Sequence, residues 1–174
     1  MNIRTIKNGV LAIALLLSST AIKAQQAKAS PAETATGTIN GANISISYSS
    51  PGVKGRKIFG GLTPYDQVWR AGANEATIFK TDKKVMIGKT PLEAGAYSIY
   101  VIPSENSWKV IFNSQTGQWG VGKGGSSRIP EKDVTTITVK TMKTPELVER
   151  LKYEITPKGV TLAWENTSVL IPVK

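Results

Sequence analysis

The stretch SPGVKGRKIFGGLTPYDQVWRAGANEAT carries side chains that could together bind a ligand. Arg56 and Arg70 have planar guanidinium groups, which can grip a carboxylate, phosphate or sulfate through paired hydrogen bonds. Trp69 could stack on a sugar face, while Asn74 and Glu75 could exchange hydrogen bonds with hydroxyl groups. These five residues are the candidate ligand-binding residues. The sequence assigns no catalytic residue and no metal site.

The same side chains could instead have structural roles. Trp69 could plug one end of the fold, and Arg70 could pair with Glu75 or Asp66. Asn74 could tie backbone groups together in a turn. A third alternative is a calcium site in which Asp66, Asn74 and Glu75 supply the oxygen ligands.

Residues 51–74 lack a regular hydrophobic pattern and are rich in glycine, with two prolines and four basic residues. A loop of this length in a compact domain is usually functional or contains a missed element. The segments RKIF and QVWR are the candidates for short edge strands. We therefore expect either a binding site or an irregular corner of the fold here.

The composition excludes most catalytic chemistry, because the chain contains neither cysteine nor histidine. Thiol nucleophiles, Ser-His-Asp triads, imidazole bases and the usual zinc, copper and haem ligand sets are all absent. No cofactor is expected. A hydrolase that uses two carboxylates, with Asp66 and Glu75 as the nearest pair, remains an alternative.

The N-terminal residues resemble a secretory signal. Arg4 and Lys7 precede a short apolar run, and Ala24 closes a plausible cleavage site. The run is too short for a membrane span, so we expect export to the periplasm or the cell exterior. Without residues 1–24 the chain has 19 basic and 12 acidic residues, a net charge of about +7. The basic residues are scattered, which argues against a nucleic-acid partner.

The remaining chain predicts a flexible leader over residues 25–35 and one antiparallel β-sandwich domain, jelly-roll-like or immunoglobulin-like, over residues 36–174. Asn40-Gly41 between two alternating runs is a strong hairpin signal. Alternating strands are expected in ANISISYS, AYSIYVIP, WKVIF, VTTITVK, GVTLAWE and SVLIPV.

Residues 145–150 carry mixed signals. Thr144 could cap a helix, Pro145 suits its first turn, and Glu146 lies four residues before Arg150. The following residues alternate as in a strand. We expect a short helical turn that runs into a strand.

The segment GVGKGG, residues 120–125, matches a dinucleotide-loop pattern only formally. Such a loop should leave a parallel strand and open a helix, whereas Pro130 soon follows here. A flexible loop is the better interpretation.

Several motifs together resemble a known family. YSSPGVKGRKIFGGLTPYDQVWRAGANEAT, IGKTPLEAGAYSIYVIPSENSWKVIFN, QWG and the late LAWE resemble the exported, mostly Bacteroidetes-type domain of unknown function 2911. The resemblance runs from about Ser30 to the C-terminus. It implies a class and a location but no mechanism. The family often has a tyrosine-containing segment after QWG, where this chain has VGKGGSSR, so the resemblance gives residues 121–128 no site role.

We therefore expect an exported, non-enzymatic module that binds a glycan or anionic envelope ligand through residues 51–75. The alternatives are a structural or protein-partner-binding module and a carboxylate-based hydrolase. The sequence does not specify the oligomeric state.

Overall fold

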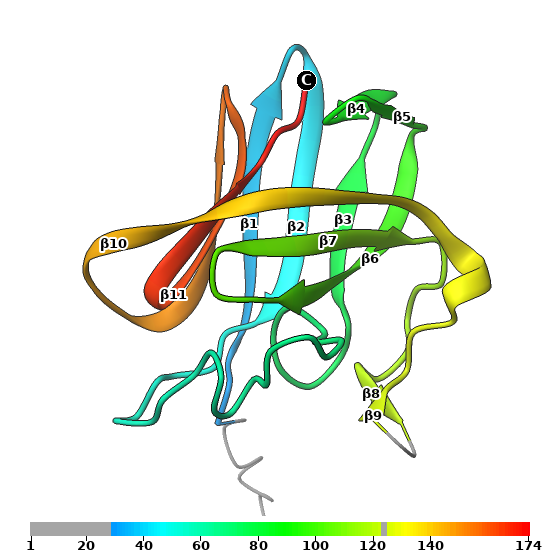
Figure 1. The fold of residues 1–174 in the computed structure, drawn as a ribbon. Coiled ribbons are helices and arrows are strands. Elements are labelled where there is room, and N and C mark those ends of the chain that lie inside the picture. The colour runs from blue at the N-terminus through cyan, green and yellow to red at the C-terminus, as the bar shows by residue number, and fades with distance from the viewer. Residues whose placement is uncertain (1–28, 123–124) are drawn as a thin grey trace, which may run out of the picture.

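The computed structural model describes residues 29–122 and 125–174, and the expected signal sequence lies outside them. The described residues form β-strands, loops and one short 3-10 helix, Pro130–Lys132 (Figure 1). The all-β prediction is confirmed. No helix in this part of the chain is long and apolar enough to cross a membrane.

Seven of the strands form one antiparallel sheet, in the order β1-β2-β3-β6-β7-β10-β11. Two further pairs, β4-β5 and β8-β9, form small ribbons. The strands are β1 (Ala32–Ile39), β2 (Ala42–Ser49), β3 (Thr77–Thr81), β4 (Val85–Ile87), β5 (Thr90–Leu92), β6 (Gly95–Pro103), β7 (Ser107–Asn113), β8 (Val121–Gly122), β9 (Gly125–Ser126), β10 (Asp133–Thr156) and β11 (Gly159–Ile171).

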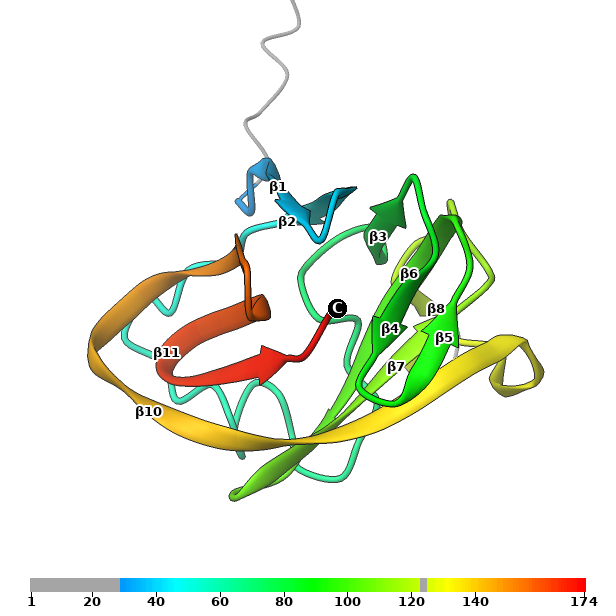
Figure 2. The same cartoon turned by 90° about the horizontal axis from the view of Figure 1, so that it is seen from above.

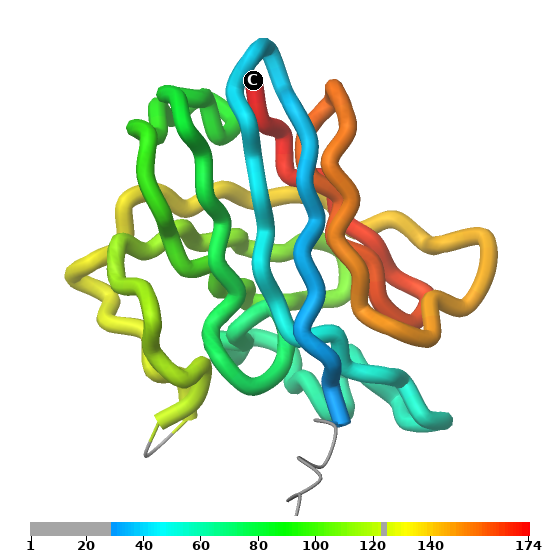
Figure 3. Tube along the Cα trace, turned by 180° about the vertical axis from the view of Figure 1, so that it is seen from behind, coloured from blue at the N-terminus to red at the C-terminus, as the bar shows by residue number. Residues whose placement is uncertain are grey.

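The large sheet curls into a nearly closed barrel (Figure 2). The first part of β10 pairs with β7 and the second part pairs with β11, which turns the sheet back toward β1. Figure 3 shows β1 beside the second part of β10. A Cβ atom on Gly37 would lie 2.6 Å from Ile155 Cγ2, so only a glycine allows this approach. The expected sandwich is thus a single curved sheet.

The hairpin predicted at Asn40-Gly41 is confirmed. Ile39 pairs with Ala42, and the two turn residues have φ angles of 49° and 78°, as a tight two-residue hairpin requires. The predicted leader, residues 25–35, extends too far, because β1 begins at Ala32. Residues 32–35 pair with the end of β2, and this pairing supplies backbone hydrogen bonds that a flexible leader would lack.

The barrel interior contains the alternating residues that the sequence predicts. Ile44, Ile46, Tyr48, Ile99, Val101, Trp108, Val110, Phe112, Val160, Leu162 and Trp164 are all buried in one cluster. Burial of large apolar side chains is the main favourable term in folding. These strands are therefore held in register by the face that each one buries.

The helical turn predicted at residues 145–150 is wrong, because β10 stays extended through this segment. Val53 N donates to Glu149 O at 2.8 Å, and Leu151 N donates to Pro51 O at 3.0 Å. These bonds to a distant loop outweigh the local helix signals. The segments RKIF and QVWR form only isolated bridges, Phe59 with Thr63 and Trp69 with Val101.

Candidate anion-binding site

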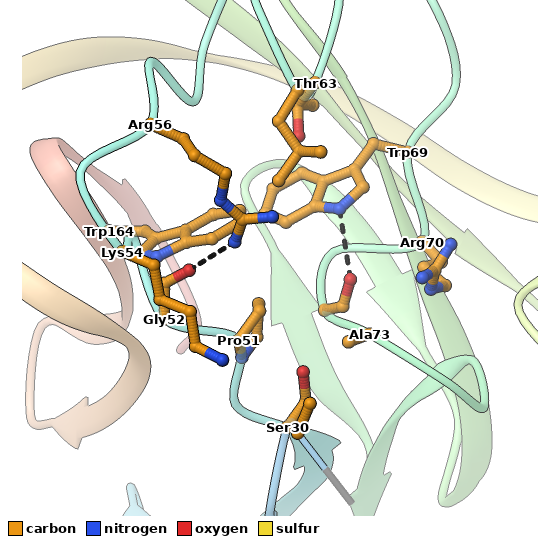
Figure 4. Close-up of a pocket in the computed structure, with 13 residues that line it drawn as sticks. Ser30, Pro51, Gly52, Lys54, Arg56, Thr63, Trp69, Arg70, Ala73 and Trp164 are labelled. Carbon is orange, nitrogen blue, oxygen red and sulfur yellow. Dashed lines mark hydrogen bonds between the residues drawn. The ribbon is translucent and has the colours of Figure 1, made fainter.

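Residues 50–73 cross the end of the barrel near the start of β1 (Figure 1). A pocket of about 370 Å³ opens at this loop (Figure 4). We call it the basic pocket, because its charged lining residues are Lys54, Arg56 and Arg70. No carboxylate lines it among the residues that the structure describes. Trp69 and Trp164 provide its aromatic wall. The arrangement favours an anion.

The aromatic wall is part of the barrel core. Trp69 stacks on Trp164 with ring centroids 5.8 Å apart and planes 20° from parallel. Phe59 and Trp108 pack against Trp69 at 5.9 and 6.2 Å. The Trp69 indole N–H donates to Gly72 O at 3.1 Å. Trp69 therefore closes this end of the barrel, which is the structural role considered from the sequence. Because one face of its ring stacks on Trp164, at most the other face can contact a sugar ring.

Two backbone carbonyl groups orient the exposed side chain of Arg56. Its Nε donates to Val53 O at 3.0 Å, and its Nη2 donates to Gly52 O at 2.7 Å. Figure 4 shows the guanidinium extending from the loop toward Trp69 and Trp164. The edge that contains Nε is thus in use, and Nη1 remains for a ligand.

Arg70 is half-buried, and its guanidinium makes no hydrogen bond or ion pair with any residue that the structure describes. Its Nε is fully buried without an acceptor. Burial lowers the pKa of Arg70 below its ordinary value, although an arginine remains charged at neutral pH. The pairing of Arg70 with Glu75 or Asp66, considered from the sequence, is not formed. The two Nη groups of Arg70 donate to no described residue and are the donors that a ligand could reach.

The loop that carries Arg70 is held in an unusual backbone conformation. Ala71 and Asn74 have φ angles of 55° and 57°, which non-glycine residues rarely adopt. The hydroxyl groups of Tyr153 and Thr77 both donate to Ala71 O, at 2.8 and 3.0 Å. Such strain persists only where surrounding contacts fix it. These two hydrogen bonds to Ala71 O therefore fix the backbone next to Arg70.

The side chain of Asn74 supports this loop. Its Nδ2 donates to Ser30 O at 3.3 Å and to Ser49 Oγ at 3.1 Å. Asn74 does not line the basic pocket. Its side chain has a structural role, but it bonds two distant segments rather than the backbone of its own turn.

Comparison with models of protein families identifies a family for this chain, but the description of that family names no activity. Residues 30–173 match the family described as Protein of unknown function (DUF2911). The chain belongs to the DUF2911 family. The matched region contains the lining residues of the basic pocket from Ser30 to Trp164. Searches of curated proteins and of solved structures gave no match.

In this DUF2911 protein, the basic pocket contains three of the five predicted ligand-binding residues, Arg56, Trp69 and Arg70. Glu75 is exposed and lines a different depression on the outer face of β1 to β3. Asp66 does not line the basic pocket either. No cluster of three acidic side chains suited to a metal ion occurs within residues 29–122 and 125–174. The ligand-binding roles of the five residues remain predictions.

Lys54 and Trp164 line the pocket but were not predicted as site residues. Lys54 lies in the same basic loop as Arg56, and this proximity could have identified it. Trp164 belongs to the LAWE motif, more than ninety residues away in sequence. Only the curl of the sheet brings it beneath Trp69.

Proposed function

We propose that this DUF2911 protein is an exported, non-enzymatic module that binds a small anionic ligand of the cell envelope in the basic pocket. One observation carries the proposal. Arg70 is a half-buried cation without a counter-ion among the described residues, and it lines a pocket with Lys54 and Arg56.

Burial of the Arg70 charge has a cost in free energy. Removing a cation from water is unfavourable unless an anion or hydrogen-bond acceptors replace the water. Arg70 lacks both among the described residues. An anion in the basic pocket would supply the missing charge, and its oxygen atoms could accept from the Nη groups of Arg70.

The chemistry of the pocket favours binding over catalysis. Neither histidine nor cysteine is present in the sequence. Asp66 and Glu75, the pair considered for hydrolysis, do not line the basic pocket. A glycan fits the proposal when it carries an acidic group, because the available aromatic surface is limited by the stack of Trp69 on Trp164. Export is supported by the basic and apolar pattern of the first residues.

A protein-partner-binding role is the second candidate. Leu62 and Trp119 are 51% and 50% exposed. Exposed apolar residues mark interaction surfaces when they form a contiguous patch. This candidate predicts association with a protein and no dependence on Arg70.

The test is thermal unfolding of the protein with phosphate, sulfate, methyl phosphate, glucuronate and neutral sugars. A ligand at about 100 times its Kd stabilises a protein by about 2.7 kcal/mol, or a few degrees in Tm. We expect stabilisation by anions and its loss in Arg70→Met. Lys109→Met is the matched control, because Lys109 is exposed on β7 and does not line the basic pocket. Equal shifts in both variants would show that the pocket is not the site.

A further inference from the structure

A second, smaller hollow of about 150 Å³ adjoins the basic pocket. We call it the side hollow. The two cavities share four lining residues, Leu62, Thr63, Trp69 and Arg70. Arg70 thus lines both cavities, and a ligand that extends along its side chain could contact both.

The side hollow differs chemically from the basic pocket. Beyond the shared residues it is lined by Pro64, Gln67, Val68 and Val121. Apart from Arg70, no charged residue lines it among the described residues. Leu62 and Val121 are 51% and 40% exposed, so water contacts large parts of two apolar side chains here. Covering this surface with an apolar group would be favourable.

We propose that the ligand is an amphiphilic anion, with its acidic head at Lys54, Arg56 and Arg70 and a short alkyl or acyl chain in the side hollow. This inference rests on the proposed function, because it assigns the acidic head to the same pocket. The chain would pass the shared wall and cover Leu62 and Val121.

A second sugar unit suits the side hollow less well. Its neutral polar side chains are those of Gln67 and Thr63, and Thr63 is only 4% exposed. Sugar recognition uses several hydrogen-bonding groups or an open aromatic face. Trp69 has one face committed to Trp164. The apolar chain is therefore the occupant that this lining favours.

The experiment is calorimetric titration of the protein with methyl phosphate, butyl phosphate, hexyl phosphate and glucose 6-phosphate. We expect the affinity to rise with alkyl length, up to about fourfold in Kd for each methylene that is fully buried. Glucose 6-phosphate should bind no more tightly than methyl phosphate. This series separates an alkyl chain from a sugar ring attached to the same anion.

Val121→Ser provides the second measurement, since Val121 lines the side hollow and not the basic pocket. It should reduce the gain from methyl to hexyl phosphate while leaving the Kd of methyl phosphate within twofold. Val134→Ser, at another exposed valine, is the matched control and should retain the gain.

The outcomes distinguish the two proposals. Equal affinities for methyl and hexyl phosphate, or tighter binding of glucose 6-phosphate than of hexyl phosphate, would overturn the amphiphile and leave the anion site standing. A gain from chain length that persists in Val121→Ser would also overturn it. Absence of binding by every phosphate would overturn both proposals.

Discussion

Gly120 lies directly against the stem of Arg70. A Cβ atom built on Gly120 would be 2.8 Å from the Arg70 Cβ and 2.9 Å from its Cγ, and closer still to its Cδ. The same glycine donates its backbone N–H to Asn74 O at 3.0 Å. The segment QWG therefore closes over the loop that carries Arg70, and the missing side chain leaves room for the arginine.

Gly120→Ala should displace Arg70 and weaken the binding of methyl phosphate, by about tenfold if the shift removes one charge-assisted hydrogen bond. A calorimetric titration measures this loss. Gly122→Ala is the control, because a Cβ atom there would meet no atom of the described residues within 4 Å. If both variants bind as the wild type does, the position of Arg70 is unimportant for binding.

Substitutions of Asn74 should separate its backbone role from its side-chain role. Asn74→Ala removes two hydrogen bonds and leaves a Cβ in the left-handed region, for a total loss of about 2 to 3 kcal/mol in the free energy of unfolding. Asn74→Gly loses the bonds but tolerates the backbone, so it should be about 1 kcal/mol more stable than Asn74→Ala. Urea unfolding measures both. Equal stabilities would mean that the backbone conformation costs little.

The predictions that the structure confirms depend on local sequence. The Asn40-Gly41 turn needs only the positive φ angles of its own two residues. The alternation of Ile44, Ile46 and Tyr48 follows from the period of a strand with one buried face. Neither feature requires knowledge of a distant segment.

The predictions that the structure corrects depend on distant contacts. Residues 145–150 carry local signals for a helical turn, but the segment is extended because residues 149–151 pair with the backbone of residues 51–53. The sequence predicts a β-sandwich, whereas seven strands form one curled sheet, because β10 changes its pairing partner from β7 to β11 along its length. Trp164 joins the pocket through the same curl. The sequence could identify the basic loop as a candidate site, but it could not show that Trp164 stacks on Trp69 in that loop.

Asp133 should make stability depend on pH in the acid range. Burial would raise its pKa, but hydrogen bonds from Arg128 and Asn113, together with the Arg128 charge, hold the pKa below its ordinary value. A depressed carboxyl pKa contributes stability above the unfolded value of about 4, and this contribution disappears as the pH falls through the folded value.

Asp133→Asn should therefore lower Tm at pH 6, and its deficit relative to the wild type should shrink as the pH falls toward 2.5. Thermal unfolding over this pH range gives the comparison. A deficit that is constant with pH would mean that the charge of Asp133 does not contribute, and that the substitution acts through shape alone.

Binding of an anion by Arg70 is tested most directly by the ¹H,¹⁵N spectrum of the arginine Nε–H groups during titration with methyl phosphate. Arg70→Lys identifies the resonance. We predict that the Arg70 signal shifts and saturates, because an anion at its Nη groups changes the electronic environment of the whole guanidinium, while the signal of Arg128, already bonded to Asp133, stays in place. An Arg70 signal that does not move, or a small unsaturated drift shared by all arginines, would contradict anion binding by Arg70.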